Sequence, residues 1–206
     1  MINKGKIMKI NEIILATGNK HKVSEIKAIL SDLNVNIKPM MEFEKYPKVV
    51  EDGLTLEENA TKKAVEVAKF FNSWAVADDT GLEVEYLNGA PGVFAARYAG
   101  EGCTYEDNNK KLLKALENAD NRKAKFRCVI ALSDPNGNKV ILSKGEINGI
   151  ISEKISGTKG FGYDPIFFVE EQGCTFAELA DGIKNKISHR ALALQDFKKN
   201  ISNLIG

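Results

Sequence analysis

Residues 13–22 read IILATGNKHK, an apolar run that passes through a glycine-containing turn into the start of a helix. The run predicts a buried strand, and apolar side chains then recur at helical spacing, at Val23, Ile26, Ile29 and Leu30. A helix start presents unpaired N–H groups and the positive end of its dipole, which suit phosphate. We call residues 17–22 the phosphate seat, although such junctions also form without a ligand.

The whole chain has the size and composition of one globular domain. It has 206 residues, of which 43% are hydrophobic and 28% are charged. We expect a single domain over residues 1–206, with residues 1–9 as a loose N-terminal extension. The sequence shows neither an apolar run of membrane-spanning length nor a signal-peptide core, so we expect a cytoplasmic protein without a membrane partner.

The charge balance and the scarcity of metal-binding side chains narrow the possible functions. Lysine and arginine number 29 and aspartate and glutamate 28, whereas nucleic-acid binders normally carry a basic excess. We therefore expect no nucleic-acid partner. Three separated cysteines and two histidines argue against a zinc site or a disulfide framework. A metal here is expected to be a hard cation held by carboxylates.

Helices and strands alternate at first, and strands dominate the middle of the chain. The patterns predict helices after Asn19, Thr55, Thr104 and Ser188, and a short one begun by Thr175 and Glu178. They predict strands at 10–16, within 34–50, and at 74–77, 83–87, 126–132, 138–143, 145–151 and 166–169. This order predicts an α/β fold with a mixed β-sheet flanked by helices.

Two acidic segments are candidates for chemistry. The strand 74–77 leads into Asp78-Asp79-Thr80-Gly81, which we predict to be a turn at the carboxyl end of that strand. Open α/β sheets bind ligands at this edge. Glu51, just before the helix capped by Thr55, could reach the same edge, and with Asp79 it could hold Mg²⁺ bridged to substrate phosphates. Both segments are also compatible with ordinary acidic turns.

Two further clusters could contact the rest of a ligand. Glycines flank Phe161, and the ring of Phe161 or Tyr163 could stack on a nucleobase, although a buried aromatic turn is equally compatible. Farther on, Lys184 and the segment Ser188-His189-Arg190 could gather cationic groups at the start of the last helix. A lone lysine or arginine at such a place is more often only solvated.

Read in order, these motifs resemble the inosine triphosphate pyrophosphatase family. The matching segments are 15–19 with Lys22, 51–60, 77–82, 89–92, 96–98, 160–165 and 188–190. The resemblance implies an elongated mixed-sheet α/β fold of two lobes with a central substrate cleft, usually as a homodimer. It also implies hydrolysis of ITP, dITP and XTP to the monophosphate and pyrophosphate with Mg²⁺.

The same resemblance implies roles for individual residues. Asp79 would be the proton acceptor and a metal ligand, Glu51 a second metal ligand, and Lys22 a catalytic and phosphate-binding group. The implied substrate-binding residues are Thr17, Gly18, Asn19, Lys20, His21, Lys22, Thr80, Phe161, Gly162, Tyr163, Asp164, Lys184, His189 and Arg190. Ala95 and Ala99 stand where relatives often have serine, so a hydroxyl contact there is not implied.

Base chemistry fits these residues. Hypoxanthine and xanthine carry an oxygen at position 6 where adenine carries an amino group, so a pocket lined with N–H donors accepts the former and leaves donor facing donor with the latter. Two alternatives stay open: a pyrophosphatase for other modified nucleotides, as in the Maf-like proteins, and a non-catalytic nucleotide or RNA binder. The Lys22, Glu51 and Asp79 set argues against the second, because binding alone needs no activated water.

Overall fold

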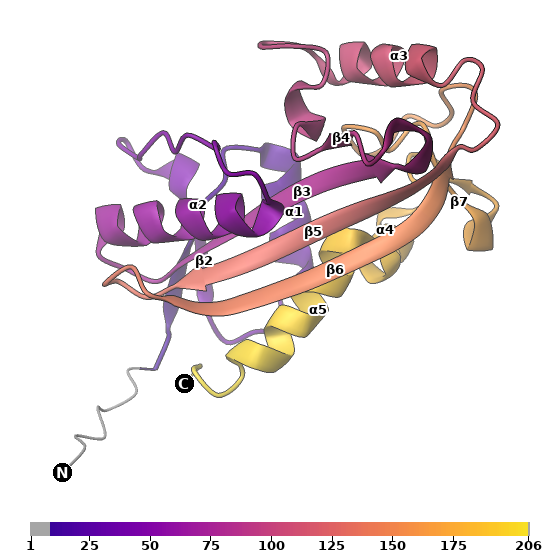
Figure 1. Ribbon diagram of the computed structural model, residues 1–206. Helices are drawn as coiled ribbons and strands as arrows, with labels where there is room; N and C mark the ends of the chain where they lie inside the picture. Colours follow the sequence, from indigo (N-terminus) through magenta and orange to yellow (C-terminus); the bar gives the residue numbers. More distant parts are fainter. Residues whose placement is uncertain (1–8, 206) are drawn as a thin grey trace.

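The computed structural model describes residues 9–205 of the chain, so all but Lys9 of the predicted N-terminal extension lies outside the described residues. One eight-stranded sheet runs through the molecule (Figure 1). Its strands are β1 Glu12–Leu15, β2 Asn36–Pro39, β3 Ala75–Val84, β4 Pro91–Gly92, β5 Lys123–Ser133, β6 Lys139–Ile151, β7 Phe167–Val169 and β8 Cys174–Thr175. They are ordered β2-β1-β3-β5-β6-β7-β8, with β4 beside β3.

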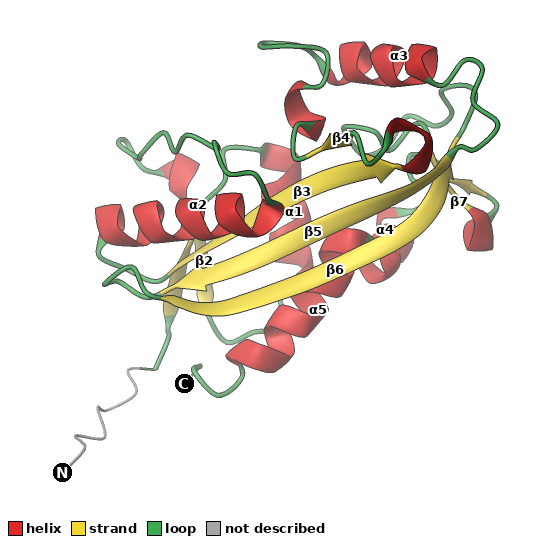
Figure 2. Cartoon of the chain, in the orientation of Figure 1, coloured by secondary structure: helices red, strands yellow, loops and turns green. Residues whose placement is uncertain are grey.

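The sheet is mixed, as predicted. Strand β1 pairs in parallel with β2 and β3, and all the other pairs are antiparallel. The three long strands β3, β5 and β6 form a twisted ribbon that runs the length of the molecule (Figure 2). At one end β1 and β2 extend the sheet, and at the other end α3 and β4 lie close to the ribbon.

Helices cover both faces of the ribbon. The helices are α1 Lys20–Ile29, α2 Leu56–Phe71, α3 Tyr105–Ala115, α4 Asp181–Ile187 and α5 His189–Ile201. Helices α1 and α5 pack on the face that carries Val76 and Ile130, whereas α2 packs on the face that carries Ala77 and Val129. Successive strand residues alternate between these two apolar layers, as the period of two requires. Among the described residues, no helix has the length and apolar character needed to cross a membrane.

Capping groups define the helix starts that position the site. Asn19 and Ser188 accept hydrogen bonds from the first turns of α1 and α5, and Thr55 and Thr104 form complete capping boxes with Glu58 and Asp107. The predicted starts of these four helices are therefore confirmed. A side chain that caps a helix satisfies N–H groups that would otherwise be unpaired.

Three local predictions are wrong. Residues 78–81 are not a turn at the end of a strand but the middle of β3, because their backbone pairs continuously with residues 127–130 of β5. For the same reason 83–87 is not a separate strand: β3 ends at Val84 and a 3₁₀ turn follows. The segments 138–143 and 145–151 are likewise a single strand, β6. A polar stretch inside a strand hides the apolar pattern on which the prediction depended.

The predicted helix begun by Thr175 and Glu178 is also wrong. Thr175 ends β8, and although Glu178 accepts hydrogen bonds from its N–H and hydroxyl, the chain then turns. The short helix of this region, α4, begins six residues later at Asp181. A capping pattern satisfies N–H groups in a turn as well as in a helix, so it cannot by itself fix where the helix starts.

Candidate active site

A cavity of about 480 Å³ lies between the N-terminus of α1, the middle of β3, and loops from the end of the molecule that carries α3. This volume is in the range of small-molecule sites. All the predicted site residues line it except Lys20 and His21, which are exposed at the start of α1. His21 still reaches its rim, because its ring stacks on that of Phe161 with centroids 5.1 Å apart.

Two N–H groups of the phosphate seat already donate to the side chain that caps α1. The Asn19 side-chain oxygen accepts hydrogen bonds from the N–H groups of His21 and Lys22, at 2.9 and 3.3 Å. The Asn19 N–H in turn donates to the Thr17 hydroxyl at 3.2 Å. A ligand at this junction therefore meets the backbone N–H of Gly18 and Lys20 and the Lys22 ammonium rather than the entire first turn.

Strand geometry sends the two neighbouring aspartates to opposite faces of the sheet. Asp78 shares the face of Val76 and points to α1 and α5, where it forms ion pairs with Lys22 at 3.0 Å and Arg190 at 3.2 Å. Although burial disfavours its charge, Lys22 and Arg190 hold the pKa of Asp78 well below its ordinary value. Asp78 is therefore ionised, and its carboxylate holds the Lys22 and Arg190 side chains in place.

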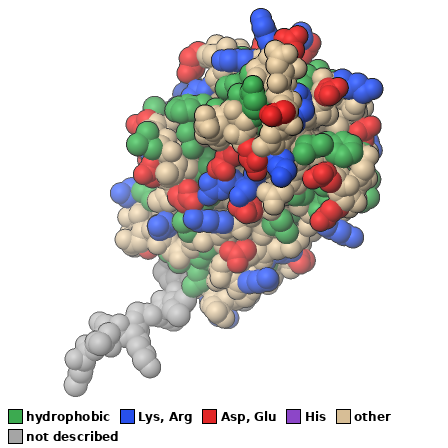
Figure 3. Space-filling view, turned by 45° about the vertical axis from the view of Figure 1, so that its right-hand side comes forward, with side chains coloured by type: hydrophobic (Ala, Val, Ile, Leu, Met, Phe, Trp, Pro, Cys, Tyr) green, Lys and Arg blue, Asp and Glu red, His purple; other side chains and the backbone are tan. Residues whose placement is uncertain are grey.

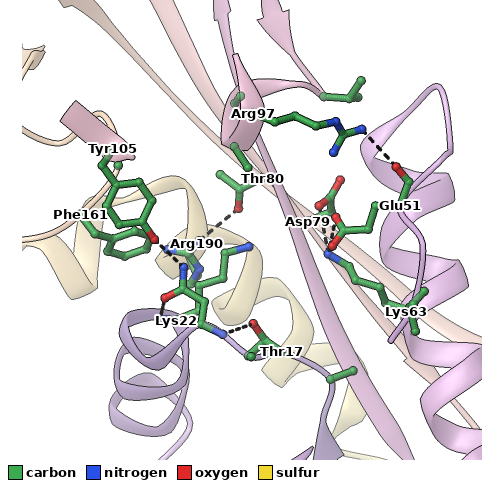
Figure 4. Close-up of a pocket in the computed structure, with 18 of the residues that line it drawn as sticks. Thr17, Lys22, Glu51, Lys63, Asp79, Thr80, Arg97, Tyr105, Phe161 and Arg190 are labelled. Atoms are coloured by element: carbon green, nitrogen blue, oxygen red, sulfur yellow. Dashed lines mark hydrogen bonds and ion pairs between the residues drawn. The ribbon is translucent and has the colours of Figure 1, made fainter. Parts of the chain in front are cut away.

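Asp79 shares the opposite face, toward α2. Its carboxylate accepts a hydrogen bond from Lys63 of α2 at 3.0 Å, and the same ammonium donates to Glu51 at 3.1 Å (Figure 4). Burial, reinforced by the neighbouring Glu51 carboxylate, raises the pKa of Asp79 to about 6 despite Lys63 and Lys22. A carboxylate with this pKa can accept a proton near neutral pH far better than an ordinary aspartate.

The donor set here fits a divalent cation. The Glu51 and Asp79 carboxylates share the Lys63 ammonium, at 3.1 and 3.0 Å, and their mutual repulsion favours any added positive charge. Carboxylate oxygens are the ligands that Mg²⁺ prefers, and this ion commonly uses one or two of them together with waters and substrate phosphates. No group of three or more potential metal-binding side chains occurs within residues 9–205, so an ion here would depend on the ligand for further oxygens.

Aromatic and cationic groups form the other end of the cavity. The Asp164 carboxylate accepts hydrogen bonds from the Phe161 N–H at 2.7 Å and from Lys184 at 2.6 Å, which closes the segment 161–164, here called the aromatic loop. The Lys184 ammonium lies 5.1 Å from the centre of the Phe161 ring. Tyr163 is buried and donates its hydroxyl proton to the Ala95 carbonyl, so Phe161 is the more available ring for stacking.

His189 also lines the cavity, and its imidazole is uncharged. Its ring stacks on Phe126 with centroids 4.5 Å apart, and its Nδ1 has no hydrogen-bond partner among the described residues. Burial, with the neighbouring charges of Arg190 and Lys184, lowers the pKa of His189 well below its ordinary value. The imidazole therefore contributes a hydrogen-bonding group of the cavity without adding positive charge.

Three functional residues were missed at the sequence level. Lys63 lies on the apolar stripe of α2 between Ala60 and Val67, and a lysine on such a stripe is a readable signal. Glu25, one turn after Lys22 in α1, accepts hydrogen bonds from both Lys184, at 2.7 Å, and Arg190. Arg97 belongs to the matching segment 96–98 but was given no role, although it lines the cavity and donates to the Glu51 carbonyl at 3.2 Å.

Charges of both signs are interspersed over the face that Figure 3 shows, rather than separated into large patches. This arrangement agrees with the near balance of acidic and basic residues in the whole chain. The electrostatic character of the site therefore comes from local pairs such as Lys22 with Asp78 and Lys63 with Asp79.

Known proteins with similar sequences cover almost the entire chain. The model of the Ham1 family matches residues 13–200. A protein of Clostridium perfringens named dITP/XTP pyrophosphatase is 48% identical over 204 residues, which are 95% of this chain and 100% of that protein. A protein of Geobacter sulfurreducens with the same name is 47% identical over 93% of this chain and 97% of its own length.

Solved structures agree. A HAM1 protein from Coxiella burnetii superimposes with a TM-score of 0.86 at 41% identity, over 94% of this chain and 100% of that one. The Ham1 protein of Staphylococcus aureus gives 0.83 at 40% identity, over 94% and 99%. The family resemblance and the fold class expected from the sequence are confirmed. Matched along most of its length by the family model and by these relatives, the chain belongs to the Ham1 family.

Proposed function

We propose that this chain hydrolyses dITP, XTP and ITP to the nucleoside monophosphate and pyrophosphate, and so removes deaminated purines from the nucleotide pool. One observation carries the proposal. A carboxylate with a raised pKa, Asp79, lies in one cavity between a helix N-terminus suited to phosphate and an aromatic loop suited to a base. The names of the relatives in Clostridium perfringens and Geobacter sulfurreducens support the same reaction.

The triphosphate would lie along the phosphate seat. The Gly18 and Lys20 N–H groups and the Lys22 ammonium supply donors there, and Asp78 holds Lys22 in place. Arg97 faces the cavity from the opposite side, from the short 3₁₀ turn Ala95–Arg97. Positive groups on both sides of the phosphates would stabilise charge as the anhydride bond between the α- and β-phosphates breaks.

Asp79 would accept a proton from the attacking water, whose oxygen forms the new bond to the α-phosphorus while pyrophosphate leaves. Lys63 holds the Asp79 carboxylate by a hydrogen bond, so its orientation is fixed before substrate arrives. We propose that Asp79 and Glu51 hold Mg²⁺, which when bound offsets phosphate charge and lowers the pKa of a bound water.

The purine would stack near Phe161, with its 6-oxygen directed to N–H donors. Most N–H groups of Lys184 and Arg190 already donate to other side chains, namely those of Glu25, Asp164, Asp78 and Thr80. Each of the two cations therefore retains one N–H for a ligand. We propose that these remaining protons and backbone N–H groups accept hypoxanthine or xanthine. With adenine they would face an amino group, and a buried donor left unpaired discriminates strongly.

Two features of the whole protein belong to the proposal. We propose a homodimer, supported by the exposed apolar side chains of Leu54 and Phe94, which line a second hollow of about 430 Å³. We also propose a cytoplasmic location, which suits both a nucleotide substrate and the three free cysteines Cys103, Cys128 and Cys174.

Steady-state release of pyrophosphate tests the proposal. Purified protein with Mg²⁺ should hydrolyse dITP and XTP with a kcat/KM at least about a hundredfold above that for ATP, the discrimination expected when a buried donor loses its acceptor. Equal rates on dITP and all the standard nucleotides would contradict purine selection. Absence of turnover with either Mg²⁺ or Mn²⁺ would contradict the enzyme assignment itself.

A further inference from the structure

Helix α3 contacts both halves of the cavity from one of its faces. The Tyr105 hydroxyl accepts a hydrogen bond at 3.0 Å from the side-chain amide of Asn19, in the phosphate seat. The side-chain amide of Asn109 donates at 3.0 Å to the Gly162 carbonyl, in the aromatic loop. Tyr105 and Asn109 are four residues apart, so they lie one turn apart on the same side of the helix.

The contact with the phosphate seat fixes the orientation of an amide. The Asn19 oxygen caps α1, while its NH₂ group is bound to Tyr105, so both ends of the amide are engaged by different elements. Rotation of this amide would break the cap and the contact with α3 together. Because Thr17 accepts from the Asn19 N–H, the order of the entire seat depends on the position of Asn19.

The contact with the aromatic loop is made by a buried amide whose acceptor oxygen is unsatisfied. Asn109 is 4% exposed, and its side-chain oxygen has no hydrogen-bond partner among the described residues. Such an arrangement lowers stability compared with an apolar residue of the same size. The benefit of this hydrogen bond is that it holds the aromatic loop, because Gly162 directly follows Phe161. The ring centre of Phe161 also lies 6.0 Å from that of Tyr105.

We propose that Tyr105 and Asn109 are positioning residues: through Asn19 and Gly162 respectively, they set the spacing between the phosphate seat and the aromatic loop to match a nucleoside triphosphate. The inference rests on the proposed function. Tyr105 acts on binding of the phosphates, and Asn109 acts on binding of the purine. A rigid helix that contacts both loops keeps the two half-sites in register before the substrate arrives.

Inorganic tripolyphosphate separates the two roles, because it can occupy only the phosphate half of the cavity. Tyr105→Phe keeps the ring and loses the hydroxyl. It should weaken tripolyphosphate binding, measured by calorimetry with Mg²⁺, and raise the KM for dITP, both by about two- to tenfold with kcat within about twofold. Asn109→Leu should raise the KM for dITP while tripolyphosphate binding stays at the wild-type value.

Tyr86→Phe is the matched control, because Tyr86 is an exposed tyrosine that does not line the cavity, and neither quantity should change. Unaltered tripolyphosphate binding in Tyr105→Phe would overturn the proposal, as would equal weakening in Asn109→Leu. So would a wild-type protein that does not bind tripolyphosphate. The binding measurement needs no turnover, so failure of the enzyme assignment would show separately, as absent pyrophosphate release.

Discussion

Asp78 and Asp79 are neighbours in the chain, yet their carboxylates lie in opposite electrostatic surroundings. Lys22 and Arg190 keep the pKa of Asp78 low, whereas burial and Glu51 raise that of Asp79 to about 6. The sequence identified Asp79 as a candidate from its place after an apolar strand and then from the family motif, but it did not reveal the opposite pKa shifts of the two aspartates. Which face each residue occupies depends on the pairing of β3 with β5, and that pairing was not predicted.

Replacing each aspartate by asparagine should therefore change the free energy of unfolding in opposite directions. Asp79→Asn removes an unfavourable ionised group, so the free energy of unfolding should rise by about 1–3 kcal/mol at neutral to alkaline pH. Asp78→Asn removes the carboxylate that Lys22 and Arg190 share and leaves Arg190 with Glu25 as its remaining carboxylate partner, so the free energy of unfolding should fall by about 3–5 kcal/mol. Urea unfolding measures both. Destabilisation by Asp79→Asn would contradict the raised pKa.

The pH dependence of this effect follows from its sign. Asp79 binds its proton more tightly in the folded than in the unfolded state, so its protonation stabilises the fold at low pH. That contribution is fully present below about pH 4, the ordinary pKa of aspartate, and is lost as the pH rises through about 6. The stability difference between Asp79→Asn and the wild type should therefore vanish near the lower value.

Catalysis should depend on the same ionisation. Asp79→Asn should lower kcat by about 10² to 10⁴-fold while dITP still binds, because the proton acceptor is lost but the phosphate seat is intact. In the wild type, kcat/KM should fall about tenfold per pH unit below about pH 6. Added Mg²⁺ should shift this fall in kcat/KM to lower pH, since a bound cation favours the ionised carboxylate. If Asp79→Asn showed the same fall in kcat/KM below about pH 6 as the wild type, Asp79 would be excluded as the proton acceptor.

At the level of elements, four of the five predicted helix starts were correct, whereas the strand limits were not predictable. Asn19, Thr55, Thr104 and Ser188 each carry a local signal, because a cap depends on residues within one turn. The middle of β3 carries polar residues on both faces, and only its pairing with β5 keeps it extended. Pairing across about 50 positions of sequence leaves no local pattern to read.

The start of α5 is positioned by close packing of this helix on β6. The packing is possible because residue 145 of β6 is a glycine. A Cβ at Gly145 would overlap the Ala193 nitrogen and the His189 carbonyl oxygen. Gly145→Ala should lower the free energy of unfolding by about 1–3 kcal/mol and reduce kcat/KM, because His189 and Arg190 would move with the helix. Urea unfolding and steady-state kinetics measure the two effects.

The control for this prediction is Gly182→Ala in α4. A Cβ there meets no atom within 4 Å, and the residue is helical, so the same substitution should raise stability by about 0.4–1 kcal/mol. Equal effects of the two substitutions would show that the contact between β6 and α5 is not the cause.

At the level of the whole molecule, the cavity depends on residues that are far apart in the chain. Glu25 and Arg190, or Lys63 and Asp79, meet only because α1, α2 and α5 pack on the two faces of one ribbon. The order of the motifs in the sequence identified about half of the residues that line the cavity. It could not assign roles to Glu25 or Arg97, because these roles come from contacts across the fold rather than from their neighbours in sequence.

Association of two copies is testable at this scale. Light scattering should give twice the mass of the chain, and Leu54→Asp or Phe94→Asp should shift it to the monomer, because each places a charge on the exposed apolar surface that we assign to the interface. Phe70→Asp, at an exposed position of α2 outside that hollow, should leave the dimer intact. A monomeric wild type at micromolar concentration would contradict the proposal.

The alternation of β3 also limits how the gene can change in length. Insertion or deletion of one codon between Ala75 and Val84 would turn every later side chain of the strand to the other face, exchanging the partners of Asp79 with those of Thr80. Codon gains and losses in a library selected for activity should therefore survive in the turn of residues 134–138, which does not line the cavity, and be absent from β3. Over evolutionary time, this strand can vary in composition but not in length.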